Sequence, residues 1–367
     1  MKIGILTQPL GSNYGGILQN YALQRWLAKM GHEPLTLSHR GHPHDLKTEV
    51  RDALVFLAKY ALFHPTRKET SFPTDDVNLY LRRFTWRKLK IKEIILSVRT
   101  VKRLGLDGFV VGSDQVWRPL YNGKALEWMY CSFLPEDSKV PVVAYAASFG
   151  VGEWEYTPEQ TEMARRNIRR FKAVSVREAS GVRLCREHLG VNAEHVLDPT
   201  LLLNPTDYMA LVPKRTLAKV PEGCVGVYIL DLTDRKRQIV ETVCHTLGKR
   251  PVYFGCRPEG KTKFPSVENW LANFERSSFI ITDSFHGTAF SINFRRPFIS
   301  IANPTRGANR FTSLLDSVGL QERLISEDGT MSALGALARR SIDWGAVNNR
   351  LNQLRKHSME FLENALS

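Results

Sequence analysis

The sequence lacks a long hydrophobic run and has few, scattered cysteines. None of its apolar runs approaches the ~18 residues that a membrane helix needs. Residues 1–7 turn polar too early for a secretory signal and are typical of a strand. The five cysteines are odd in number and form no C-x-x-C pair, as expected of reduced thiols. These absences predict a cytoplasmic protein without a disulfide framework.

Some cofactor and catalytic signatures are missing as well. The Gly11–Gly16 turn is not a G-x-G-x-x-G fingerprint, and no Gly-Lys-Ser/Thr follows it as in a phosphate loop. The chain has no Gly-x-Ser-x-Gly elbow. His39, His42 and His44 lie in a proline-containing loop without a nearby cysteine or carboxylate pair, which is typical of ordinary loop histidines. We therefore expect no metal site and no bound cofactor.

Acidic residues are outnumbered by 51 Lys+Arg to 37 Asp+Glu, for a net charge of +14. Nine basic residues and one acid fall between Arg82 and Arg103. Such an excess favours a polyanionic partner. For the segment 82–103, a solvated face is the first interpretation and contact with anionic lipid at the inner face of the membrane is the second. Nucleic acid ranks last, because no known nucleic-acid-binding pattern accompanies the charge, and we expect no such partner.

The order of apolar segments predicts an α/β protein with two parallel sheets. A strand at 2–7, a helix that ends near 30 and a strand at 35–37 form one β-α-β unit. Further strands are expected at 108–111, 142–145 and 173–176, and a second series of strands and helices spans 225–283. Two prolines within 196–208 mark a boundary. We therefore expect one Rossmann-like domain over 1–200, another over 206–340, and a helix over 342–366 that crosses back to the first.

Polar residues follow the predicted strands, at the sheet edge where open α/β folds bind ligands. After the first strand, the Gly11–Gly16 turn would cradle a phosphate or approach an acceptor, or would be a tight turn only. Asp114 follows the strand at 108–111, where it would serve as a base beside Trp117, a flat face for a sugar. A helix cap at Asp114 and a core position for Trp117 are equally compatible with the pattern. Arg177 would bind a carboxylate or phosphate, or pair with Glu178.

The segment from Ser284 to Leu315 contains no Asp or Glu, but does contain His286 and several arginines. A helix that begins near Gly287 would direct its free N–H groups and positive dipole end toward the strand tip. His286 would add a titratable donor there, and Arg306 and Arg310 would lie on the same rim. The pattern predicts a pocket for a phosphate or carboxylate.

Six segments then occur in one order: NYGGILQNYALQ, GSDQVW, YAASFG, SVREASG, VLDPTLLL and ITDSFHGTAFSINFRRPFI. Together they resemble the polysaccharide pyruvyl transferase family, from residue 1 to about 325. The resemblance implies a GT-B-like fold, in which two Rossmann-type domains face a central cleft. It implies an enzyme that transfers the enolpyruvyl unit of phosphoenolpyruvate to hydroxyls of a cell-surface or exopolysaccharide sugar, as a pyruvate ketal. A GT-B glycosyltransferase that uses a nucleotide sugar is the alternative, and a non-catalytic glycan- or anion-binding protein is the third reading.

For that chemistry we expect His286 to act as an acid or phosphate ligand and Asp114 as a base. The anionic donor is expected at Arg177, Ser284, Gly287, Thr288, Arg306 and Arg310. The glycan or lipid-linked glycan acceptor is expected at Asn13, Tyr14, Gly15, Ser113 and Trp117. Family members commonly carry Arg-Leu-His where this chain has Ser284-Phe285-His286, so Arg306 or Arg310 would replace the missing arginine.

Overall fold

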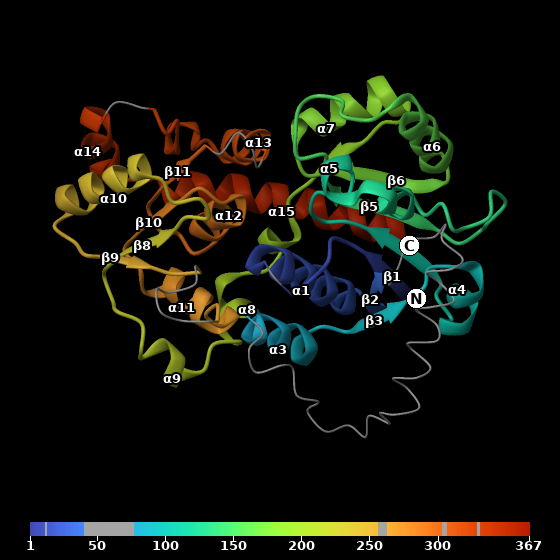
Figure 1. The fold of residues 1–367 in the computed structure, drawn as a ribbon, viewed down its shortest axis with the longest axis horizontal. Helices are drawn as coiled ribbons and strands as arrows, with labels where there is room; N and C mark the ends of the chain where they lie inside the picture. The colour runs from blue at the N-terminus through green and yellow to red at the C-terminus, as the bar shows by residue number, and fades with distance from the viewer. Residues whose placement is uncertain (12, 40–76, 256–262, 303–306, 329–330) are drawn as a thin grey trace.

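The computed structural model describes residues 1–11, 13–39, 77–255, 263–302, 307–328 and 331–367. It consists of two α/β units that lie side by side, with one long helix running along both (Figure 1). Each unit is built on a sheet in which every strand pairs in parallel with its neighbours. The predicted two-sheet α/β architecture is therefore confirmed.

The N-terminal unit has a seven-stranded sheet in the order β3-β2-β1-β4-β5-β6-β7. Its strands are β1 (Lys2–Leu6), β2 (Glu33–His39), β3 (Ile91–Ile94), β4 (Gly108–Val111), β5 (Val142–Ala147), β6 (Phe171–Val176) and β7 (Glu194–His195). Its helices are α1 (Tyr14–Lys29), α3 (Leu79–Lys88), α4 (Val98–Leu104), α5 (Pro119–Asn122), α6 (Pro158–Ile168) and α7 (Ala179–Leu184). The central strands β4 and β5 are buried along their whole length, which explains their unbroken apolar sequence.

The C-terminal unit has a five-stranded sheet in the order β12-β11-β10-β8-β9. Its strands are β8 (Val225–Tyr228), β9 (Pro251–Tyr253), β10 (Phe279–Thr282), β11 (Phe298–Ile301) and β12 (Leu324–Ile325). Its helices are α10 (Asp234–Leu247), α11 (Val267–Arg276), α12 (Phe285–Asn293), α13 (Asn309–Val318) and α14 (Met331–Arg339). Between the two sheets the chain forms a short 3-10 turn at Pro199–Leu201 and the helices α8 (Pro205–Met209) and α9 (Lys214–Leu217).

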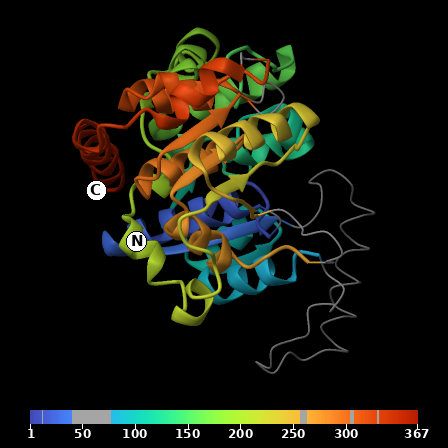
Figure 2. The same cartoon turned by 90° about the vertical axis from the view of Figure 1, so that its left-hand side faces the viewer.

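The long helix α15 (Trp344–Leu366) contacts both units. Its Arg350 donates a hydrogen bond to the carbonyl of Val318 in the C-terminal unit, at 3.2 Å. Its Ser358 accepts one from the amide of Leu197, at 2.9 Å, next to the N-terminal sheet. In the view turned by 90°, α15 (dark red, beside the C label) is seen nearly end-on at one edge of the molecule (Figure 2). The helix therefore connects the two units along one side.

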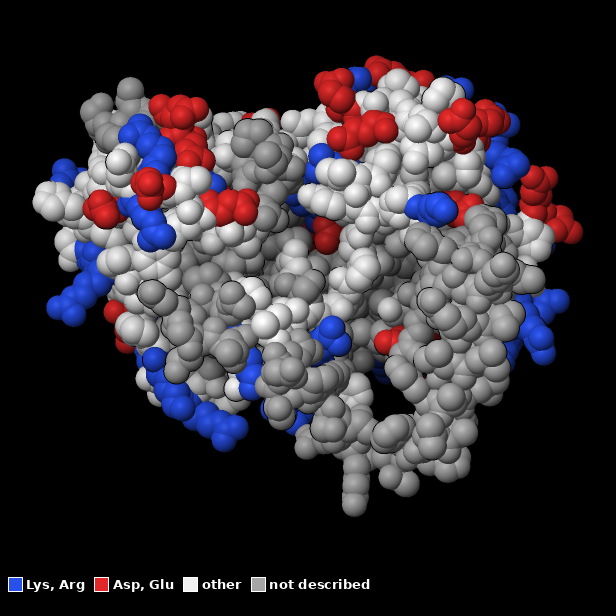
Figure 3. All heavy atoms as spheres, in the orientation of Figure 1, with Lys and Arg blue, Asp and Glu red and all other residues white. Residues whose placement is uncertain are grey.

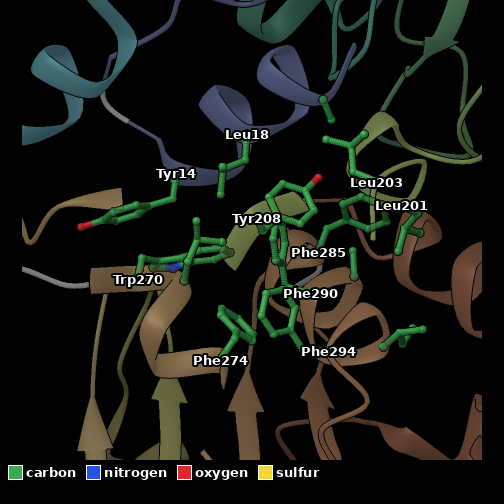
Figure 4. Packing of buried hydrophobic residues seen from close by; sticks show 14 of the residues in the cluster. Tyr14, Leu18, Leu201, Leu203, Tyr208, Trp270, Phe274, Phe285, Phe290 and Phe294 are labelled. Carbon is green, nitrogen blue, oxygen red and sulfur yellow. The ribbon is translucent and has the colours of Figure 1, made fainter. Parts of the chain in front are cut away.

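The two units also share a hydrophobic core, in which α1 packs against α11 and α12 (Figure 4). The ring of Tyr14 stacks on Trp270, with centroids 5.6 Å apart, and its hydroxyl donates to the carbonyl of Pro265 at 2.7 Å. Trp270 and Tyr208 in turn contact Phe290, at centroid distances of 4.8 and 4.9 Å. This packing brings the N-terminal end of α1 toward the N-terminal end of α12.

The basic segment 82–103 forms α3, β3 and α4, and its nine Lys and Arg residues are all exposed. On the face shown in Figure 3, acidic side chains gather over the top of the N-terminal unit, near α6, whereas basic ones are scattered over both units. In the ranges that the structure describes, no helix combines the length and the apolar character needed to cross a bilayer.

Candidate functional site

A cavity of about 410 Å³ lies between the two units, beyond the carboxyl ends of β4 and β10. The β1–α1 turn and Asp114 line it from the N-terminal unit, and the start of α12 and Arg310 line it from the C-terminal unit. In the space-filling view a hollow separates the two units, with both basic and acidic atoms on its walls (Figure 3). Open α/β folds bind ligands at this position, so the cavity is the candidate site.

His286 lies in the first turn of α12, which begins earlier than the sequence predicts. The helix starts at Phe285, not at Gly287, because Ser284 adopts an extended conformation and caps it by accepting the amide hydrogen of Gly287 at 3.4 Å. His286 is 5% exposed and lines the cavity. Its Nε2 lies 3.7 Å from Oδ2 of Asp198, which is too long for a hydrogen bond. Among the described residues Nε2 has no hydrogen-bond partner.

Gly15, at the start of α1, contacts His286 from the other unit. A methyl group built on Gly15 would overlap Nδ1 of the imidazole, whereas one on Gly16 would lie 3.7 Å from Oδ2 of Asp114, an ordinary contact. Asn13 caps α1 by accepting the amide hydrogens of Gly15 at 2.9 Å and Gly16 at 3.3 Å. The predicted Gly-rich turn therefore allows α1 to approach the histidine closely.

This contact predicts a difference between two neighbouring substitutions. Gly15→Ala should lower the free energy of unfolding by about 1–3 kcal/mol, because the added methyl group overpacks the interface with His286. Gly16→Ala should be neutral or raise it by up to about 1 kcal/mol, because alanine favours the helix. Urea unfolding of both variants tests the contact, and equal stabilities would contradict it.

Asp114, Arg177 and Asp198 form a chain of charges under the cavity. Nη2 of Arg177 lies 3.3 Å from Oδ1 of Asp114, and its Nη1 lies 2.6 Å from Oδ2 of Asp198. The amide of Gln115 also donates to Oδ1 of Asp114, at 2.9 Å. Arg177 and Asp198 are almost completely buried, whereas 14% of the Asp114 side chain remains exposed at the cavity. Asp114 is thus the member of this chain that is available to a ligand.

Asp198 was missed as a site residue in the sequence, where it was interpreted as part of the domain boundary. Its Oδ1 accepts hydrogen bonds from the amide and the hydroxyl of Thr200, at 2.9 and 2.7 Å. Its Oδ2 accepts one from the hydroxyl of Ser113, at 3.3 Å, besides the ion pair with Arg177. The sequence feature that could have indicated Asp198 is its place before a proline in an otherwise apolar segment. An aspartate there is commonly a helix cap, but its charge is costly to bury without a partner.

Charges around the cavity shift the pKa values of its groups. Burial raises the pKa of Asp114, but the positive charges of Arg177, His286 and Arg310 outweigh it, so the net pKa is lowered and the carboxylate stays ionised. Burial raises the pKa of Asp198, but the nearby His286 and Arg177 outweigh it, so the net pKa is held far below its ordinary value.

Arg310 brings a second guanidinium to the same place. It is 6% exposed and its guanidinium carbon lies 5.4 Å from the ring centroid of Phe285, while that of Arg177 lies 4.7 Å from the same ring. Burial, together with the charge of Arg177, lowers the pKa of Arg310 to about 10, so it remains charged at neutral pH. The buried carboxylate of Glu178 acts on both arginines besides Asp114 and Asp198, and Asp283 lines the cavity and pairs with Lys236 at 2.8 Å. Positive and negative side chains are therefore mixed around the cavity, and Arg310 and His286 are the basic side chains among the described residues that line it.

Several predicted ligand contacts are corrected by the structure. Trp117 is fully buried, stacks on Tyr130 with centroids 5.3 Å apart and cannot present a face to a sugar. Ser113 is likewise fully buried against Asp198. Tyr14 is buried in the core between the units and does not line the cavity. These three side chains have structural positions in place of the predicted acceptor contacts.

On the predicted donor side, Ser284 lines the cavity, but Gly287 and Thr288 do not. Gly287 is buried against Thr282, and the Thr288 hydroxyl bonds to Ser300 at 2.6 Å and to the carbonyl of Ser284 at 3.2 Å. Both are therefore structural. Arg306, and likewise His42 and His44, lie outside the described residues. Within the described ranges, no three His, Cys, Asp or Glu side chains cluster as metal ligands.

Known proteins resemble the chain in family and in fold. The model for the polysaccharide pyruvyl transferase family matches residues 13–305. The structure of S. aureus MnaA with UDP has a TM-score of 0.51 at 10% identity, over 96% of this chain and 91% of that one. UDP-GlcNAc 2-epimerase from Methanocaldococcus jannaschii has a TM-score of 0.50 at 11% identity, over 94% and 93%. At this identity the likeness shows only the fold, which is GT-B.

The chain matches none of the curated proteins with which it was compared. The family match, in contrast, runs from the start of α1 past β11 and covers Asp114, Arg177, Asp198 and the whole of α12. Because it spans well over half of the chain, the protein belongs to the polysaccharide pyruvyl transferase family and is a transferase.

Proposed function

We propose that this protein transfers the pyruvyl unit of phosphoenolpyruvate to hydroxyls of a saccharide and forms a pyruvate ketal. The observation that carries the proposal is His286, which lines a cavity that Asp114 and Arg310 also line and whose buried Nε2 has no hydrogen-bond partner among the described residues. Phosphoenolpyruvate has a phosphate and a carboxylate, and both need cationic or N–H partners.

Arg310 and the first turn of α12 are the proposed binding groups for the donor. The amides of this turn carry the positive end of the helix dipole, and the first turn contains no acidic residue. Arg310 would compensate for the arginine that the Ser284-Phe285-His286 segment lacks. Arg177 is committed to Asp114 and Asp198, so its proposed role is to orient those carboxylates.

In the proposed reaction, protonated His286 delivers its proton to the methylene carbon C3 of the donor, which leaves a cation at C2. The carboxylate of Asp114 stabilises this cation electrostatically. An acceptor hydroxyl then forms a bond to C2 and loses its proton to Asp114. Although the pKa of Asp114 is lowered, the oxygen becomes strongly acidic as the bond forms, so a weakly basic carboxylate suffices.

The ketal then requires a second substitution at the same carbon. The bond from C2 to the phosphate oxygen breaks, phosphate departs, and a second hydroxyl of the same sugar bonds to C2. Of the two hydroxyl protons, one restores the proton that His286 supplied and the other leaves with phosphate. We propose a glycan of a cell-surface or exopolysaccharide pathway, free or lipid-linked, as the acceptor, with cytoplasmic action and the exposed 82–103 segment toward anionic headgroups.

A glycosyltransferase that uses a nucleotide sugar is the second candidate. It is favoured by the likeness of the fold to S. aureus MnaA, whose structure contains UDP. The two candidates differ in the anion that the cavity binds. Thermal unfolding in the presence of phosphoenolpyruvate or UDP separates them, and stabilisation by UDP alone would favour the glycosyltransferase.

Turnover tests the first proposal directly. The protein is incubated with phosphoenolpyruvate and a panel of mono- and oligosaccharides, and released phosphate and the mass of the saccharide are measured together. We expect equal amounts of phosphate and of saccharide that carries one pyruvate ketal. Phosphate release without a modified saccharide, or no reaction with any member of the panel, would reject the proposal.

A further inference from the structure

A second cavity, of about 580 Å³, adjoins the candidate site on the N-terminal unit. It is lined by the ends of β1 and β2, by the helix α3 and by residues from α5 to Met129. Gln8, Pro9 and Tyr121 line both this cavity and the candidate site, so the two cavities share part of their walls. A molecule whose reacting end lies beside Asp114 would reach the second cavity past the half-exposed ring of Tyr121.

Tyr121 lies at the boundary between the cavities and is 46% exposed. The guanidinium carbon of Arg118 lies 5.1 Å from its ring centroid. Arg118 is itself buried and bonded to both carboxylate oxygens of Glu155, at 3.1 and 3.3 Å. The ring is thus supported by an anchored arginine, while much of it remains open to a ligand, an arrangement that holds a flat apolar surface in place.

The rest of the second cavity combines aromatic surface with charge. Trp86 on α3 is 55% exposed and lines it, and Arg82 and Glu93 also line it. Deeper polar groups are bonded within the protein: Thr36 donates to Asn20 at 2.8 Å, and the Asn122 amide donates to three backbone carbonyls. Exposed rings beside charged side chains suit a sugar, which has apolar C–H faces and a hydroxyl periphery.

We propose that the second cavity binds the sugar residues next to the one that is modified, so that the acceptor is an oligosaccharide of at least two residues. This inference rests on the proposed function, because it assigns the reacting sugar to the candidate site. Tyr121 and Trp86 provide the stacking surfaces. They replace Trp117, which was one of the predicted acceptor contacts but is fully buried.

A glycan array that includes monosaccharides and oligosaccharides tests the proposal without any turnover. Wild-type protein should bind oligosaccharides and not the corresponding monosaccharides. Tyr121→Ala and Trp86→Ala should each weaken the affinity for the best-bound oligosaccharide about three- to tenfold, because each removes one aromatic contact. Tyr121→Phe should retain it. Tyr80→Ala is the matched control, since Tyr80 is 41% exposed on the same helix as Trp86 and lines neither cavity.

Three results would overturn the inference: no glycan is bound, monosaccharides are bound as tightly as oligosaccharides, or the two alanine variants bind like the Tyr80→Ala control. Because binding is measured without phosphoenolpyruvate, loss of the extended acceptor site is distinguishable from failure of pyruvyl transfer. A protein that binds oligosaccharides through Tyr121 but releases no phosphate would retain this inference and reject the proposed reaction.

Discussion

His286→Asn is expected to lower kcat for pyruvyl transfer by about a hundredfold to ten-thousandfold, the range for removal of a general acid. Asparagine has a similar shape but cannot deliver a proton to C3 of the donor. The His286 ring fills the space between Gly15 and Asp198, so the smaller side chain should leave the fold intact. Steady-state kinetics with phosphoenolpyruvate, together with the thermal unfolding temperature, separates lost chemistry from lost structure.

His245→Asn provides the matched control for this prediction. His245 is exposed near the end of α10 and lines neither cavity, so its replacement should leave kcat unchanged. A pH–rate profile adds a second readout, because the limb of the wild-type profile that reports the acid should disappear in His286→Asn. If His286→Asn retains the wild-type kcat, His286 is not the acid.

Asp198→Ala is expected to lower the free energy of unfolding by about 3–5 kcal/mol, the range for removing one partner of a buried ion pair. The substitution leaves Nη1 of Arg177 without its 2.6 Å partner and removes the acceptor for two bonds from Thr200. Glu187→Ala is the control, since the Arg183–Glu187 pair is about half exposed and such pairs contribute at most about 1 kcal/mol. Urea unfolding measures the stability of both variants. Equal losses of stability would contradict a buried ion pair between Arg177 and Asp198.

The effect of Asp198→Ala should also depend on pH. The pKa of Asp198 is lowered in the folded protein, so its contribution to stability is fully present above the unfolded pKa of about 3.9 and is lost as pH falls toward the folded pKa. The difference in stability between wild type and variant should therefore be constant from pH 5 to 7, to within about 0.5 kcal/mol, and decrease below about pH 4. A difference that grows as pH falls would mean that the folded pKa is raised.

Much of the fold could be predicted from the sequence, because buried parallel strands have a simple pattern. The strand at 108–111 is observed as β4 (Gly108–Val111), and the helix that was expected to end near 30 is α1, which ends at Lys29. Parallel strands also bring their carboxyl ends to one edge, which is why Asp114 and Arg177 could be expected to lie close together.

The failures share a physical cause, since a linear pattern does not show what a side chain meets across the fold. Trp117 follows the end of β4 whether it contacts a sugar or lies in the core. Only its stacking on Tyr130 shows that it is a core residue. Asp198 gained its role from Arg177, which lies 21 residues earlier and at the end of another strand. The sequence does not indicate Tyr121 as a ligand contact, because that position depends on its contact with Arg118 and on the shape of two cavities.

The central claim is that the cavity between the units binds phosphoenolpyruvate, and a crystal structure of the protein with this donor tests it most directly. We expect the donor in the cavity, with its anionic groups within hydrogen-bond distance of Arg310 or the first-turn amides of α12 and with C3 next to Nε2 of His286. A donor that binds elsewhere, or a cavity that takes up UDP but not phosphoenolpyruvate under the same conditions, would contradict the account.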